Sequence, residues 1–215
     1  MQNPEDAIPF PPKPADLHSK GSQAVLGCGG RKVVWILAGL CLLIALARWH
    51  TYDEPTDRDT GGYAVIAHEV LNGERIYDGV LLDQKPPAIH FTYGVAEWLA
   101  GYGRLQVYLL SVAAAIATLI GFYFSGKVIG GSRSAGLWAA VFWVAVSGDL
   151  VLEANQPNSE VFINAWTVFG LIFLFGNLRG MIPWRQALLA GICFAMASLY
   201  KHVVVVIPMF VGLAY

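Results

Sequence analysis

Long apolar runs dominate this sequence and limit what it can fold into. They lie near 33–49, 105–124, 135–148, 161–177, 186–200 and 203–215. A helix needs about 20 mainly apolar residues to cross the ~30 Å hydrocarbon core of a bilayer, and several of these runs approach that length. Of the 215 residues, 56% are hydrophobic and only 13% are charged, which is far from the balance of soluble domains. The sequence therefore predicts an all-α, polytopic bundle of transmembrane helices.

The two ends of the chain differ from this pattern. Residues 1–30 contain PFPPKP and GCGG with little apolar periodicity, so we expect a disordered cytoplasmic tail. Residues 31–215 are expected to form the N-terminal part of a transmembrane domain. The last residues, HVVVVIPMFVGLAY, stop inside an apolar segment, which predicts that the chain is truncated at its C-terminus. A cleaved signal sequence ending near Ala47 is an alternative interpretation of the first run, but its leader is too long for one.

The distribution of basic residues predicts an orientation in a cell membrane. Lys127 and Arg133 lie in the segment after the second run, and Arg179 and Arg185 lie in the segment after the fourth. Because cytoplasmic loops collect Lys and Arg, we expect these segments and the N-terminus on the cytoplasmic side of the inner or plasma membrane. The long loop at 50–104 and the segment after the third run, which lacks Lys and Arg, then face outward.

Two short helices are predicted inside the long outer loop. The segment AIHFTYGVAEWLAG at 88–101 makes about 21 Å of helix, too short for a span, and we expect an interfacial or re-entrant helix. A second helix is expected from about Gly61 to Asn72, capped by Asp59 or Thr60. It is predicted to lie along the membrane surface with its apolar face down.

Candidate functional residues occur in the same outer loop. Asp57 and Asp59 belong to the acidic stretch DEPTDRD, which is either part of a site or a solvated, helix-capping loop. In DQKPP at 83–87, the two prolines hold Lys85 in an extended conformation at the mouth of the re-entrant helix. A Lys in this position is suited to bind a lipid phosphate, and a snorkelling Lys at the membrane interface is the alternative.

Three further charged residues are predicted on the outer side. Glu160 follows an Asn-rich loop and begins a span, so it is either a second wall of the site or a charge that the helix dipole favours. Arg104 and Lys201 each lie at the end of an apolar run. They either balance phosphate charge or anchor the chain at the interface.

Other features exclude whole classes of function. The net charge of −1 and the lack of a basic recognition helix or zinc-finger spacing argue against nucleic-acid binding. Cys28, Cys41 and Cys193 show no metal-ligand spacing and are interpreted as inert packing residues. The expected partners are membrane lipids and what lipids carry.

Several motifs together resemble the GT-C superfamily of polytopic membrane glycosyltransferases. These are an Asp four residues before a Tyr in DTGGYAVIAHEVLNGERIY, a KPP about 25 residues later, the stretch EVFINAW, and GICFAMASLYK before an apolar stretch with Pro. The likeness is greatest to bacterial relatives of the protein O-mannosyltransferases and of the lipid A aminoarabinose transferase. It covers roughly residues 31–215.

The resemblance implies a role for several residues. Asp59 matches the family acid that acts on the acceptor, Glu160 matches a second acid that shapes the site, and Lys85 matches the Lys that engages the donor phosphate. Arg104 and Lys201 are expected to help bind that phosphate. Tyr63 and Asp57 are expected to position the substrates.

These roles imply transfer of a sugar from a polyprenyl-phosphate donor to a hydroxyl of a lipid, glycan or protein at the outer face. Some relatives have Glu before the Lys in a metal-contacting role, whereas this chain has Gln84. The resemblance implies a possible divalent metal, but this departure argues against metal dependence, so no cofactor is certain. The alternatives are a transporter or flippase of lipid-linked sugars, in which charged residues line a pathway, and a catalytically incomplete fragment.

Overall fold

The computed structural model describes residues 29–78, 83–148, 156–176 and 183–214, and all regular elements in these ranges are helical. The helices are α1 (Gly30–Ala47), η2 (Trp49–Tyr52), α2 (Arg58–Leu71), α3 (Ala88–Ala100), α4 (Arg104–Ile129), α5 (Arg133–Val146), α6 (Ser159–Phe175), α7 (Trp184–Ser198), η3 (His202–Val205) and α8 (Val206–Ala214). This confirms the predicted all-α class. The predicted tail at 1–30 lies almost entirely outside the described residues.

Each apolar run contains a helix, but the helices are not all as long as a membrane span. α1 and α4 are the two described helices that are long and apolar enough to cross a membrane. A signal sequence or the core helix of a soluble protein can be equally long and apolar, so these two helices give weak support for membrane association. α5, α6 and α7 have 14, 17 and 15 residues, which corresponds to about 21–26 Å of helix.

The helix boundaries differ from the apolar runs by a few residues because polar caps extend the helices. At α5, for example, the Ser132 side chain accepts a hydrogen bond of 3.1 Å from the backbone of Ala135, so the helix begins before its apolar run. The last run differs more. The residues after Lys201 form the 3₁₀ turn η3, in which Val204 N–H donates to the Lys201 carbonyl, and α8 follows only from Val206.

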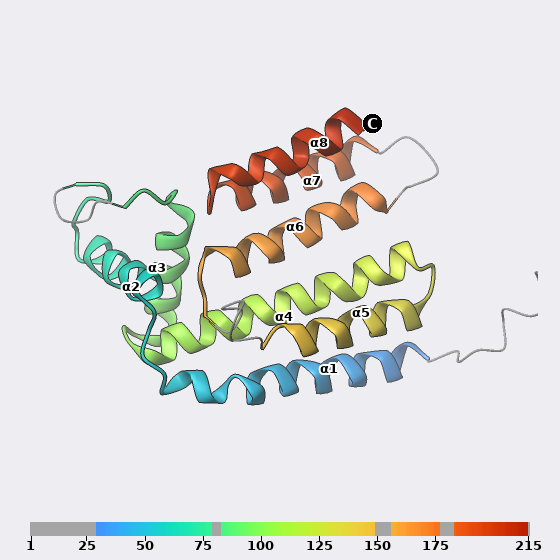
Figure 1. Cartoon of the computed structure of the whole chain (residues 1–215), viewed down its shortest axis with the longest axis horizontal. Coiled ribbons are helices and arrows are strands. Elements are labelled where there is room, and N and C mark those ends of the chain that lie inside the picture. The colour runs from blue at the N-terminus through green and yellow to red at the C-terminus, as the bar shows by residue number, and fades with distance from the viewer. Residues whose placement is uncertain (1–28, 79–82, 149–155, 177–182, 215) are drawn as a thin grey trace, which may run out of the picture.

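Figure 1 shows α1, α4, α5, α6, α7 and α8 running side by side along the long axis, with α2 and α3 gathered at one end. α4 packs against α1, α3, α5 and α6, and α6 also packs against α7. Glycines allow close approach. A Cβ on Gly136 of α5 would lie 2.5 Å from the Tyr123 backbone oxygen of α4, and one on Gly121 would meet Val168 of α6. Small residues at helix contacts have this effect in membrane and soluble bundles alike.

Arg48 joins α1, α4 and α5 through its side chain. It is 3% exposed at the C-terminus of α1, and its guanidinium donates to Ser111 Oγ of α4 at 2.5 Å and to the backbone oxygen of Ser147 after α5. A buried guanidinium is tolerated only where its donors are satisfied. These bonds therefore hold the end of the bundle from which the chain continues into α2.

The predicted surface helix at Gly61–Asn72 is present as α2, but it begins three residues earlier. Asp57, and not Asp59 or Thr60, is its N-cap, because the Asp57 carboxylate accepts the Asp59 N–H at 3.3 Å. Its buried face packs on α3 and carries Tyr63, which is 3% exposed. Tyr63 therefore packs inside the protein, and its ring does not contribute to an apolar face that rests on a membrane.

We expect Gly136→Ala to destabilise the α4–α5 packing. The added Cβ would meet backbone, which cannot move as a flexible side chain can, and such overpacking costs about 1–3 kcal/mol. Gly39→Ala in α1 is the matched control, because its Cβ would meet nothing within 4 Å. Thermal unfolding of the detergent-solubilised protein should show a lower midpoint for Gly136→Ala only. Equal midpoints for the two variants would contradict the close packing.

Candidate functional site

The N-terminal turn of α2 places a carboxylate beside a phenol. Asp57 caps the helix, so Asp59 lies in its first turn, where the helix dipole favours a negative charge. Tyr63 follows one turn later, and its hydroxyl donates to Asp59 Oδ2 at 3.3 Å. The spacing of four residues puts both side chains on the same face of the helix. Asp59 remains half exposed, with 53% of its side chain accessible.

The segment before α3 brings a cation to this carboxylate. Lys85 Nζ lies 3.5 Å from Asp59 Oδ2 and 5.9 Å from the centroid of the Tyr63 ring. The Lys85 backbone is held on both sides. Its N–H donates to Asp83 Oδ1 at 3.1 Å, and its carbonyl accepts from the Tyr77 hydroxyl at 2.7 Å. Pro86 and Pro87 then lead directly into α3, so the chain direction at Lys85 is restricted.

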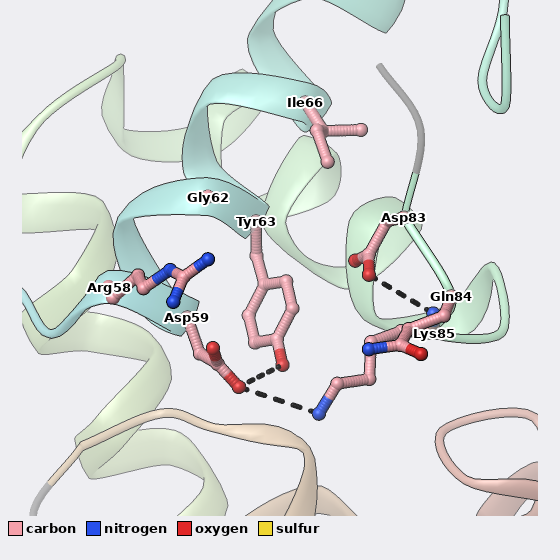
Figure 2. Close-up of a pocket in the computed structure, with 8 residues that line it drawn as sticks. All are labelled: Arg58, Asp59, Gly62, Tyr63, Ile66, Asp83, Gln84 and Lys85. Carbon is pink, nitrogen blue, oxygen red and sulfur yellow. Dashed lines mark hydrogen bonds and ion pairs between the residues drawn. The ribbon is translucent and has the colours of Figure 1, made fainter. Parts of the chain in front are cut away.

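Asp59, Tyr63 and Lys85 line an open pocket of about 750 Å³. Figure 2 shows Tyr63 pointing from α2 toward Lys85, with Asp59 and Lys85 on either side of its hydroxyl. The remaining lining residues are Arg58, Gly62, Ile66, Asp83 and Gln84. The pocket therefore combines a carboxylate, a phenol and an ammonium group within reach of one ligand.

The pocket shifts the pKa values of two of its groups. Burial raises the pKa of Tyr63, and the negative charge of Asp59 adds to this effect against the opposing contacts with Ser159 and Lys85. Burial lowers the pKa of Lys85, but contacts with Tyr63 and the charge of Asp59 outweigh it, so the net shift is upward. At neutral pH the pocket therefore holds a neutral phenol and a protonated ammonium.

Glu160 and Lys201 form an ion pair at the edge of the same end of the bundle. Glu160 lies in the first turn of α6, and Lys201 directly precedes η3. One neighbour lies close to the site, because Ser159 is near enough to the Tyr63 hydroxyl to lower the pKa of Tyr63. Tyr200, which precedes Lys201, stacks on Phe162 of α6. Figure 1 shows the start of α6 and the α7–η3 junction beside α2 and α3. Neither Glu160 nor Lys201 lines the pocket with Lys85.

Arg104 lies elsewhere. It begins α4 and pairs with Asp53 at 3.0 Å, and both side chains are exposed. It lines a different pocket of about 480 Å³, which borders α2 through Gly61, Ala64 and Val65. The structure thus separates Arg104 from Lys85, although both were predicted to bind one phosphate.

A metal site is not formed by the described side chains. Within these residues, no group of three or more His, Cys, Asp and Glu is arranged to hold a metal ion. Asp59 and Asp83 are the carboxylates that line the pocket, and the amide Gln84 lies between Asp83 and Lys85 in the sequence.

Sequence reasoning missed three residues around the pocket. Asp83 accepts the Lys85 N–H, His90 packs edge-on against the Tyr63 ring, and the buried Ser159 lies near the Tyr63 hydroxyl. An Asp side chain often accepts a hydrogen bond from the backbone N–H two residues later, so the contact of Asp83 with Lys85 could have been found from the sequence. His90 and Ser159 carry no local signal, because their roles depend on which helices pack together.

The Asp57 cap leads to a stability prediction. Asp57→Ala should destabilise the protein by about 0.5–2 kcal/mol, because the first turn of α2 loses its side-chain acceptor. Asp57→Ser keeps an acceptor and should retain most of the stability. Thermal unfolding compares the two variants with the unchanged protein. If Asp57→Ser were as unstable as Asp57→Ala, the capping role would be refuted.

The arrangement can bind an anion at Lys85 and can accept a proton at Asp59 in the same pocket. Comparisons with known proteins add no assignment, since no protein-family model, no curated protein and no solved structure matches the chain. The chemistry of the pocket must therefore be inferred from its residues and their geometry.

Proposed function

We propose that the chain is a membrane glycosyltransferase that moves a sugar from a polyprenyl-phosphate donor to an acceptor hydroxyl at the extracytoplasmic face. The observation that carries the proposal is the convergence of Asp59 and Lys85, 26 positions apart in sequence, in one open pocket. A lipid-linked sugar phosphate offers an anion for the ammonium group. Its acceptor offers a hydroxyl proton for the carboxylate.

The distribution of charge supports a multi-pass arrangement with the pocket outside. Figure 1 places the start of α1, the α4–α5 turn and the start of α7 at the end opposite to α2 and α3. That end carries Lys32, Lys127, Arg133 and Arg185. Cytoplasmic loops are rich in Lys and Arg, so this end is proposed to face the cytoplasm, with the N-terminus on the same side.

The surface of the helices supports burial in lipid. Large apolar side chains are exposed along α1, α5 and α7, for example Trp35, Trp138, Phe142 and Trp184. Soluble monomers rarely expose contiguous apolar patches of this kind. Helices shorter than the bilayer core, such as α5, are accommodated in membranes by local thinning and by interfacial residues.

The proposed reaction needs one base and one phosphate-binding group. Asp59 Oδ2 accepts the proton of the acceptor hydroxyl as its oxygen bonds to the anomeric carbon of the sugar. The bond from that carbon to the phosphate oxygen breaks, and the electron pair leaves with the polyprenyl phosphate. Lys85 stabilises this charge, and the configuration at the sugar carbon inverts. Tyr63 holds Asp59 toward Lys85 through its hydroxyl.

We expect Asp59→Asn to lower sugar transfer by about 10²–10⁴-fold, because the amide cannot take the acceptor proton. Purified protein would be incubated with a panel of polyprenyl-phosphate sugars, and released polyprenyl phosphate would be measured by mass spectrometry. Asp53→Asn is the matched control, because Asp53 forms an exposed ion pair with Arg104 outside the pocket. Transfer by Asp59→Asn at the normal rate would remove the base from the mechanism. Movement of lipid-linked sugars between leaflets without transfer would favour a flippase.

We expect Lys85→Ala to weaken binding of the donor phosphate about ten- to hundredfold, the range of a hydrogen bond to a charged group. The measurement is a calorimetric titration of detergent-solubilised protein with polyprenyl monophosphate. Lys127→Ala, in the last turn of α4 at the opposite end, is the control. Equal affinities for the two variants would contradict the role of Lys85.

A further inference from the structure

Asp83 connects the Lys85 segment to a buried histidine. Its Oδ1 accepts the Lys85 N–H at 3.1 Å, and its Oδ2 lies 3.2 Å from Nε2 of His90. The Asp83 side chain is 17% exposed at the rim of the pocket, and His90 is 2% exposed in the first turn of α3. One carboxylate therefore contacts both the backbone that carries the ammonium group and the helix behind it.

His90 is held between α2 and α3. Its ring meets the Tyr63 ring edge-on, with 5.7 Å between centroids. Among the described residues neither ring nitrogen has a hydrogen-bond partner of good geometry, and the Asp83 carboxylate is the polar group that lies 3.2 Å from Nε2. Burial lowers the pKa of His90 although Asp83 opposes this, so the imidazole is neutral at neutral pH. A carboxylate opposite Nε2 favours the tautomer that carries its proton on Nε2.

The contact between Asp83 and His90 bears on Lys85 through the Lys85 backbone. Asp59 faces the Lys85 ammonium, whereas Asp83 holds the Lys85 N–H. The Tyr77 hydroxyl holds the Lys85 carbonyl, and Pro86 restricts the chain immediately after it. An ammonium group on a flexible four-carbon stem reaches a defined place only if its backbone is held. The carboxylate that accepts this N–H lies 3.2 Å from the buried ring of His90.

We propose that Asp83 and His90 are positioning residues of this site. The Asp83 carboxylate lies against the buried His90 ring and orients the Lys85 backbone. The Lys85 ammonium group then meets the donor phosphate beside Asp59. This inference rests on the proposed transferase function for its consequence in catalysis. The anchoring itself is a property of the folded chain and can be measured without a substrate.

The first test measures the exposure and basicity of the Lys85 amine directly. The full chain in detergent is treated with an amine-acylating reagent, and the labelling rate of Lys85 is determined by peptide mass spectrometry with Lys127 as the internal reference. Without the Asp83 carboxylate, the Lys85 ammonium should move away from Asp59, which lowers the pKa of Lys85 and exposes its amine. We therefore expect Lys85 to be labelled several-fold faster in Asp83→Ala than in the unchanged protein. An unchanged rate would overturn the proposal.

Conservative variants separate positioning from general damage. Asp83→Asn keeps the oxygen that accepts the Lys85 N–H, and His90→Gln offers an N–H donor to Asp83, so both should label Lys85 nearly as slowly as the unchanged protein. His90→Phe fills the same buried space without a donor and should label fast. If His90→Gln and His90→Phe behaved alike, His90 would be a packing residue only.

Sugar transfer provides the second measurement. Asp83→Ala and His90→Phe should raise KM for the donor more than they lower kcat, because Asp59 remains in place. If the unchanged protein transfers no sugar while labelling still responds to Asp83→Ala, the proposed function fails and the anchoring stands. If the unchanged protein is active and the labelling of Lys85 does not respond, the positioning role alone fails.

Discussion

Burial of the Tyr63 ring between α2 and α3 is the interaction on which the candidate site depends. The ring is 3% exposed and packs edge-on against Tyr93 and His90 of α3, while its hydroxyl reaches Asp59. Aromatic burial of this kind provides much of the packing energy between two short helices. Because the same side chain belongs to the core and to the pocket, the packing of α2 on α3 also places Asp59 opposite Lys85.

The rest of the bundle serves as a rigid support for this end. Tyr93 also donates its hydroxyl to the Pro157 carbonyl before α6, and Gln106 of α4 donates to the Tyr93 carbonyl. The Thr92 and Tyr200 hydroxyls are 2.6 Å apart, which ties α3 to the end of α7. These hydrogen bonds connect α3, which packs against α2, to α4, to the segment before α6 and to the end of α7. The pocket side chains on α2 and before α3 are therefore already oriented before a ligand binds.

Local patterns were sufficient for several features of the site. The apolar runs predicted the helices. The four-residue spacing of Asp59 and Tyr63 is enough to put both on one face once the helix begins before Asp59. The prolines after Lys85 predicted that a helix begins directly after them, which α3 confirms. The extended conformation predicted for Lys85 is wrong, because the chain bends at Gln84 and Lys85, where Asp83 accepts the Lys85 N–H. The start of α2 was placed too late because Asp57, Asp59 and Thr60 are all acceptable caps, and only the backbone geometry at Asp57 decides among them.

Local sequence patterns are enough to establish that this chain is helical and apolar, and which short segments carry an acid, a phenol and a cation. Which of these groups meet depends on how the helices pack. In the folded chain Lys85 lies beside Asp59, and Glu160 pairs with Lys201. Arg104 pairs with Asp53 outside the pocket, and His90 packs edge-on against Tyr63. The physical reason is that hydrophobic periodicity and caps act within a few residues, whereas contacts between helices depend on the shapes of both packed faces, which no single segment contains.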